Sequence, residues 1–320
     1  MIARYARLRS YPGVFRALTG LRLGEFDGLV ADLLPAYRAA EEARLARPTT
    51  GRPTRLRAIG GGSQFALGPR DQLLLSVVWL RQYPTHLVLG YLFGISDRAV
   101  RRLLGRVLPL LEQAGRDGMR GPRATPQRSR RDLSDLLAAV PELAVLVDTF
   151  EQPVQRPRDR TEADGYYSGK KKRHTLKVQV AVARTTGRIV DVPRSVPGPT
   201  ADLTLLKQSG LLHRLPPDVA VGGDLAYVGI AAAHPTGQGF TPRRKPRGRD
   251  RPRPPEDVAY NTAFARQRIG VEHSIGRLRH YECLTQRDRH HRQHHTARVV
   301  AVAGLVHRAL DMRFPNGLGR

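Results

Sequence analysis

Cysteine is almost absent from this sequence: Cys283 is the only one in 320 residues. A single thiol excludes an internal disulfide framework and any cysteine-based zinc cluster within one chain, and it fits a reduced, intracellular setting. Long apolar runs are also missing, because the longest, such as Val299 to Val306, are too short to cross a bilayer. The first nine residues lack the apolar core of a signal peptide. We therefore expect a soluble, cytoplasmic protein with no membrane partner.

Acidic residues are scarce as well. The chain has 28 Asp and Glu against 54 Lys and Arg, a formal net charge of +26. Such an imbalance disfavours a compact state unless a polyanion is the usual partner, and nucleic acid is the obvious one. Arginine outnumbers lysine, which suits bidentate phosphate contacts, although a GC-rich genome would give the same bias. The length is sufficient for two or three domains.

Against this background, three acids stand out. Asp148 and Asp224 each follow a short apolar run typical of a buried strand, and Glu272 lies at the edge of the apolar stripe of a helix expected over residues 259–281. Each has a simpler explanation: an acid can begin a loop, and Glu272 can pair with Arg268 four residues earlier. Three convergent carboxylates in a basic protein nevertheless indicate a metal site that acts on phosphate.

The first third of the chain is predicted to be helical. Apolar spacing gives a helix over residues 26–45, followed by a breaker-rich linker, so that residues 1–66 form a helical lead-in. Three more helices follow: one from Pro69 that ends before Pro84, one capped by Thr85, and one capped by Ser96 that runs to about Leu108. This spacing predicts a helix-turn-helix domain over residues 67–115.

The third of these helices separates its faces by chemistry. Its apolar side carries Val100, Leu103, Leu104, Val107 and Leu108. Its other side carries Arg98, Arg101, Arg102 and Arg106. A basic outer face on the second helix of such a pair is suited to entry into a DNA major groove. A small helical bundle with a solvated arginine face would show the same pattern.

Beyond a basic linker and helix at residues 116–140, the sequence favours an antiparallel meander. The prolines of residues 151–157 exclude that segment from a central strand. Strands are expected over residues 175–183 and 188–196. The turn before these strands carries four consecutive cations beside two tyrosines: Lys170, Lys171, Lys172 and Arg173. This turn is either a solvated tip or a surface that binds a nucleic-acid strand.

Several later features have both structural and functional readings. Thr200 can cap a helix over residues 202–212. Asp202 would lie in the first turn of that helix, where an acid interacts favourably with the helix dipole, so Asp202 is only a secondary catalytic candidate. Residues 235–257 are rich in Pro, Gly and Arg, and form either a disordered insertion or a DNA clamp through Arg243, Arg244 and Lys245. The His290–His295 cluster has zinc-like spacing on a helix, but phosphate contacts or a solvated face are favoured.

The ordered motifs resemble those of DDE-superfamily transposases of bacterial insertion sequences of the insertion-sequence-five type. The resemblance covers residues 67 to 310 and rests on these segments: Val147-Asp148, Glu151-Gln152-Pro153, Tyr167-Ser168-Gly169-Lys170-Lys171, His174-Thr175-Leu176-Lys177, Pro197-Gly198, Asp224-Leu225-Ala226-Tyr227 with Gly229, and Val271-Glu272-His273 with Gly276-Arg277-Leu278. The preceding helix-turn-helix resembles the one that those enzymes carry ahead of the catalytic domain.

This resemblance implies an α/β, ribonuclease-H-like catalytic domain over residues 141–312, with a mixed five-stranded sheet flanked by helices and a short tail at 313–320. Asp148 would lie on the first strand, Asp224 after the fourth and Glu272 on the late helix. As catalytic residues they would hold two Mg2+ ions about 4 Å apart, with Mn2+ as a substitute. The chain departs from the family pattern at Thr149-Phe150, Ala201 and Leu225-Ala226.

The implied function is a transposase that binds terminal inverted repeats, nicks the DNA ends and joins the freed 3′-hydroxyls to target DNA. The expected partners are double-stranded DNA and further copies of the chain, assembled on DNA in the nucleoid. Two alternatives stay open: a non-transposing endonuclease on the same fold, and a transposon-derived DNA-binding protein without catalysis.

Overall fold

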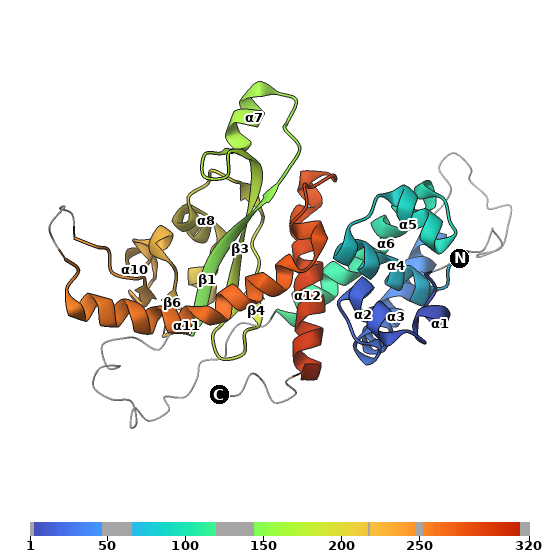
Figure 1. The fold of residues 1–320 in the computed structure, drawn as a ribbon, viewed down its shortest axis with the longest axis horizontal. Coiled ribbons are helices and arrows are strands. Elements are labelled where there is room, and N and C mark those ends of the chain that lie inside the picture. The colour runs from blue at the N-terminus through green and yellow to red at the C-terminus, as the bar shows by residue number, and fades with distance from the viewer. Residues whose placement is uncertain (1–2, 47–65, 120–143, 217, 247–251, 314–320) are drawn as a thin grey trace. The chain divides into compact units, whose positions relative to one another are not determined.

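The computed structural model describes residues 3–46, 66–119, 144–216, 218–246 and 252–313. The chain divides into two compact units (Figure 1). The helical unit comprises residues 1–117, 280–283 and 300–312, and the sheet unit comprises residues 118–279, 284–299 and 313–320. Within the described ranges, every helix is too short or too polar to cross a membrane.

In the helical unit, the predicted helix caps at Thr85 and Ser96 are present. Its helices are α1 (Tyr5–Leu8), α2 (Pro12–Thr19), α3 (Leu23–Ala46), α4 (Pro69–Gln82), α5 (His86–Phe93), α6 (Asp97–Gly118) and most of α12 (His295–Arg313). The Thr85 hydroxyl accepts a hydrogen bond from Val88 N at 3.4 Å and so caps α5. The Ser96 hydroxyl accepts one from Ala99 N at 3.2 Å at the start of α6. Between these caps, Gly94 ends α5 with a left-handed φ of 67°.

Helix α6 is longer than predicted. An end near Leu108 is wrong, because the helix passes through Pro109 and continues to Gly118. The buried stripe continues with Leu111 and Gly115, so burial outweighs the hydrogen bond that the proline removes. Most of the predicted linker, and the helix expected over residues 132–139, lie outside the described residues.

Two glycines allow α6 to pack closely against α12 within the helical unit. A Cβ atom on Gly115 would lie 2.2 Å from the carbonyl oxygen of Val300, and one on Gly304 would lie 2.8 Å from the Cα of Gly115. Any larger side chain at these positions would force the two helices apart.

The sheet unit contains a mixed sheet, as predicted. Its strands are β1 (Val145–Pro153), β2 (Tyr167–Ser168), β3 (Arg173–Ala183), β4 (Ile189–Asp191), β5 (Val196–Pro197), β6 (Val221–Gly222) and β7 (Gly239–Phe240). The order is β2-β3-β1-β6-β7, and β4 and β5 also pair with β3. The pair β1–β3 is antiparallel, whereas β1–β6 and β6–β7 are parallel.

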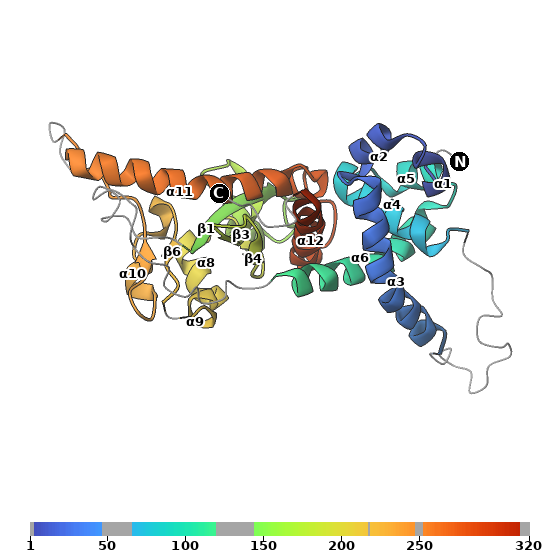
Figure 2. The same cartoon turned by 90° about the horizontal axis from the view of Figure 1, so that it is seen from below.

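Helices cover both faces of this sheet. They are α7 (Arg160–Tyr166), α8 (Asp202–Ser209), α9 (Leu211–Arg214), α10 (Ile230–Ala233) and α11 (Pro255–Arg279), with short 3-10 turns η1 (Leu225–Tyr227), η2 (Glu282–Leu284) and η3 (Arg292–His294). Val145 and Val147 pack in one apolar core with residues of α8, α9, η1 and α10. Helix α11 contacts β1 and β3, and Figure 2 shows it on the opposite side of the strands from α8 to α10. The central strands are therefore buried on both faces.

Three local predictions in the sheet unit are wrong. Strand β1 continues into the segment 151–157 as far as Pro153, which is its last residue, where a missing N–H costs little. The strand expected over residues 188–196 divides into β4 and β5 around Pro193. The helix expected over residues 202–212 divides at Gly210, whose φ is 67°, and its N-cap is Ala201 rather than Thr200.

Part of the basic insertion at residues 235–257 belongs to the sheet, so the reading of the insertion as disordered is wrong for that part. Strand β7 lies within it and extends the sheet beside β6. Just before it, His234 is buried, and its Nε2 lies 3.2 Å from Val219 O. Residues 247–251 lie outside the described residues, and α11 begins at Pro255.

Candidate active site

The register of β1 and β6 brings two of the predicted acids together. Val145 pairs with Val221 and Leu146 with Gly222 in parallel register. Two residues beyond this last pair, β1 carries Asp148 and the chain after β6 carries Asp224. Because parallel strands present their carboxyl ends at the same edge, the two carboxylates lie at neighbouring positions.

Asp148 is largely enclosed at the point where β1 loses its β6 neighbour. Its Oδ1 accepts a hydrogen bond from Thr149 N at 2.7 Å, and its Oδ2 forms an ion pair with Arg268 Nη2 of α11 at 3.1 Å. Burial raises the pKa of Asp148, the Thr149 N–H and Arg268 lower it, and the charges of Asp224 and Asp202 raise it further. The carboxyl group therefore lies among other negative charges, and Arg268 only partly balances them.

Asp202 and Asp224 occupy the starts of two short helices. Asp224 caps η1, because its Oδ1 accepts a hydrogen bond from Ala226 N at 2.9 Å. Asp202 lies in the first turn of α8, as predicted, but its carboxylate is also paired with a cation: Lys177 Nζ lies 2.6 Å from Asp202 Oδ1. The helix dipole is thus only part of the reason for an acid at position 202.

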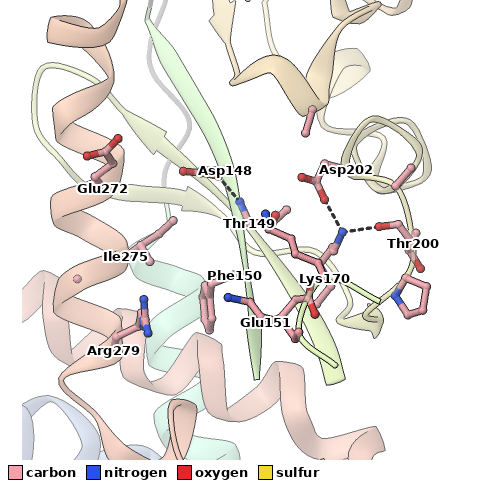
Figure 3. A pocket seen from close by; sticks show the side chains of 16 residues that line it. Asp148, Thr149, Phe150, Glu151, Lys170, Thr200, Asp202, Glu272, Ile275 and Arg279 are labelled. Atoms are coloured by element: carbon pink, nitrogen blue, oxygen red, sulfur yellow. Dashed lines mark hydrogen bonds and ion pairs between the residues drawn. The ribbon is translucent and has the colours of Figure 1, made fainter. Parts of the chain in front are cut away.

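A cavity of 610 Å3 opens at this edge of the sheet. Asp148, Asp202 and Glu272 all line it (Figure 3). Figure 3 shows the Asp148 side chain turned toward α11, the helix that carries Glu272 one turn after Arg268. Glu272 is exposed, and Arg268 forms its ion pair with Asp148 instead of the pair with Glu272 that the simpler reading supposed. Asp148, Asp202 and Glu272 therefore share one cavity at the end of β1, whereas Asp224 is not among the residues that line it.

The chemistry of these donors fits a divalent cation. Tyr227 is fully buried, and its pKa is raised by burial and then by the charges of Asp202, Asp148 and Asp224, so the carboxylates lie near one another. Clustered carboxylate oxygens are the ligands that Mg2+ and Mn2+ prefer. In the part of the chain that the structure describes, no group of three or more His, Cys, Asp or Glu is already arranged to hold a metal ion.

Three of the four predicted DNA-binding arginines of α6 are exposed: Arg98, Arg101 and Arg102. Arg106 is half-buried and forms an ion pair with Glu41 of α3 at 3.4 Å. The apolar side of α6 is buried at Val100, Leu103, Leu104 and Val107, while Leu108 is half-buried. The exposed arginines thus form a basic face, and Arg106 links two helices of the same unit.

The cationic turn between β2 and β3 is exposed from Lys170 to Arg173, and Lys170 and Lys171 line the 610 Å3 cavity. Beside this turn, the Tyr167 ring packs edge-on against His174 at 5.5 Å. Because Lys170 and Lys171 line the cavity, contact between this turn and a ligand in the cavity is favoured over a role as a solvated tip.

The cations of the basic insertion differ in their surroundings. Arg243 forms an ion pair with Asp257 at 2.9 Å and lies over the Tyr260 ring at 4.5 Å, while Asn261 binds its backbone N–H and carbonyl. Arg243 therefore anchors the segment to α11. Arg244 and Lys245 are exposed next to that anchor.

The histidine cluster does not form the helical zinc-like pattern. Its middle forms the short turn η3, and only His295 begins a helix. His295 is buried between Gln152 Oε1 at 2.7 Å and Ser195 Oγ at 2.8 Å, and burial lowers its pKa to about 3. This histidine has a structural role, since it joins the end of β1 to the start of α12.

Sequence reasoning missed three residues of the site: Lys177, Arg268 as the partner of Asp148, and Tyr227. One signal could have revealed Lys177. In β3 the apolar positions alternate with Lys177 and Gln179, which predicts a polar face, yet the whole strand from Thr175 to Ala183 is buried. Charged and amide groups on a buried strand face indicate a site rather than solvent.

Comparisons with known proteins place both parts of the chain in one family. Residues 147–307 match the family described as DDE superfamily endonuclease, and residues 65–117 match the helix-turn-helix of DDE superfamily endonuclease. A protein of Microchaete diplosiphon described as a probable transposase for the insertion sequence element IS702 is 28% identical over 243 residues, which cover 76% of this chain and 81% of that protein. No solved structure matches. The mixed sheet and the preceding helix-turn-helix are consistent with a ribonuclease-H-like fold, and the chain belongs to the DDE superfamily of transposases and endonucleases.

Proposed function

We propose that this protein is a transposase that binds the terminal inverted repeats of an insertion sequence, cuts the DNA at those ends and joins the freed 3′-hydroxyls to target DNA. The observation that carries the proposal is the register of β1 and β6, which sets Asp148 beside Asp224 at one sheet edge. Glu272 lines the cavity that opens there.

In this proposal Asp148, Asp224 and Glu272 hold two Mg2+ ions, for which Mn2+ can substitute. When bound, such ions activate water or a 3′-hydroxyl and stabilise the leaving oxygen of an in-line displacement at phosphorus. Arg268 must release the Asp148 carboxylate for both of its oxygens to become available. Burial raises the pKa of Asp148, and the charges of Asp224 and Asp202 raise it further beside Arg268, so a bound divalent cation would stabilise the ionised carboxylates.

In this proposal, the exposed cations of α6 and of the turn between β2 and β3 bind and orient DNA. The exposed arginines of α6 are suited to the major groove of the repeat. Lys170 and Lys171 line the cavity itself and contact the phosphates that flank the cut. Copies of the chain assembled on the two DNA ends would bring both ends to one target.

The test uses the full-length protein, a duplex that ends in the element's own repeat, and a Mg2+ titration. We expect nicking at the repeat end, followed by joining of the 3′-hydroxyl to a target plasmid. Asp224→Asn and Glu272→Gln should each abolish both steps and leave repeat binding unchanged. If these two variants cut as fast as the parent protein, the assignment is wrong.

The same assay distinguishes the two alternatives. Cleavage without any strand transfer would identify a non-transposing endonuclease. Specific repeat binding without Mg2+-dependent nicking would identify a transposon-derived DNA-binding protein.

A further inference from the structure

A buried lysine lies at the candidate active site. Lys177 is only 8% exposed, in the middle of β3, and it lines the 610 Å3 cavity together with Asp148 and Glu272. Its Nζ donates to Thr200 O at 2.5 Å and to Asp202 Oδ1 at 2.6 Å, the two contacts drawn as dashed lines in Figure 3.

Packing does not require this cation. Its cross-strand neighbour Glu151 does not supply the partner charge, because Glu151 Oε2 accepts a hydrogen bond from Thr175 Oγ1 at 2.6 Å. Instead the lysine reaches past its own strand to the first turn of α8. A buried ion pair is often no more stabilising than an apolar pair of the same volume, so a buried pair that lines a cavity suggests a role toward a ligand.

The donor count leaves one position for that ligand. An ammonium group has three N–H donors, and two acceptors within the described residues take two of them. Asp148 and Glu272, two of the three carboxylates that we propose as metal ligands, line this cavity, so the phosphate to be cut must lie in the same space. An anionic oxygen is the natural third acceptor for a desolvated ammonium.

We infer that Lys177 contacts a non-bridging oxygen of the phosphate that is cut, and that Asp202 positions Lys177 rather than holding a metal ion. The inference rests on the proposed function. Charge that builds up on the phosphate during displacement is stabilised by a cation already fixed in a water-poor cavity. Asp202 and Thr200 hold that cation in place before DNA arrives.

The experiment compares Lys177→Gln, Asp202→Asn and the double variant with Lys207→Gln, a matched control that removes an exposed lysine from α8. Single-turnover cleavage at saturating DNA is measured across a Mg2+ titration. Lys177→Gln and Asp202→Asn should each slow cleavage by about 10²-fold, without moving the Mg2+ midpoint by more than about twofold. The double variant should be no slower than Lys177→Gln, because Asp202 acts through the lysine.

Binding of a pre-cut repeat end in Ca2+ gives a second readout that does not depend on cleavage. Lys177→Gln should weaken binding by about tenfold and Lys207→Gln by less than about twofold. If Lys177→Gln does not fold, Lys177→Met keeps the apolar stem and serves in its place. Thermal melting of each variant identifies those that fold.

Two results would overturn the inference. One is an Asp202→Asn protein with a Mg2+ midpoint raised at least about tenfold, which would make Asp202 a metal ligand. The other is unchanged binding by Lys177→Gln. Absence of cleavage by the parent protein would instead count against the proposed function, and the binding measurement would still test Lys177.

Discussion

The charges on the outer face of α6 and those at the candidate active site of the sheet unit lie in opposite environments. On α6, Arg98, Arg101 and Arg102 are exposed above a closed apolar core. In the sheet unit, Asp148 and Lys177 are largely enclosed, and each is paired through a specific atom. Exposed cations attract any phosphate at little cost, whereas enclosed charges stay in place only when partners hold them.

This difference suggests two separate tasks for the charged residues, DNA binding and catalysis, which the net charge alone does not distinguish. In the proposed function, the exposed arginines supply affinity for DNA, which salt screens. The enclosed charges would supply the chemistry, because a water-poor cavity strengthens their interactions. Variants in the two units should therefore fail in different ways, and the predictions below test that separation.

The largest effect is expected from Asp148→Asn. It removes a charge that no neighbour can replace, so cleavage of repeat-ended DNA should fall by about 10³-fold or more, while repeat affinity stays within about twofold. Gel-shift and single-turnover assays on the same preparation measure both quantities. A parallel loss of binding would break the separation between the two units.

The next largest effect is expected from replacing Arg98, Arg101 and Arg102 together with Ala. Repeat binding should weaken by about 10²-fold at physiological salt, and the slope of log affinity against log salt should fall by about 0.9 for each phosphate that the protein no longer neutralises. At saturating protein, cleavage should recover. Arg106→Ala is a useful contrast: its side chain pairs with Glu41, so stability should change more than the salt slope.

A smaller effect concerns the packing that holds the basic face. Gly115→Ala would place a Cβ 2.2 Å from Val300 O, and we expect it to destabilise the helical unit by about 1–3 kcal/mol. The control is Gly105→Ala on the same helix, where a Cβ meets nothing within 4 Å and the substitution should stabilise by about 0.5–1 kcal/mol. Denaturant unfolding measures both. Equal effects would show that α6 and α12 do not pack as described.

The effect that is smallest near neutral pH, and grows only in acid, concerns the sheet unit. Burial keeps His295 neutral in the folded state, with a pKa of about 3, whereas the unfolded chain binds a proton near pH 6.5. The contribution of neutral His295 to the free energy of unfolding should therefore be fully present above about pH 6.5. It should fall by about 1.4 kcal/mol per pH unit as the pH drops from there toward the folded pKa of about 3. His295→Gln should flatten this dependence, and His294→Gln, at an exposed position, should not.

Local chemistry in the sequence correctly predicted the helical unit. The Thr85 and Ser96 caps, Gly94 and Pro84 act within a few residues, so each signal and its effect are neighbours in the chain. The same local rules failed at Pro109 and Pro153, where burial of the surrounding residues decided the outcome. Tertiary packing can outweigh the local cost of a proline.

The sequence by itself determined the family, the mixed fold and the acids worth testing, because ordered motifs and charge imbalance are properties of the chain. Only the tertiary structure decided which groups meet at the end of β1. The β1–β6 register sets Asp148 beside Asp224, Arg268 reaches Asp148 across the α11 interface, and Lys177 meets Asp202 between β3 and α8. Strand register and the burial of both sheet faces arise from contacts between residues far apart in the chain, and no local pattern encodes them.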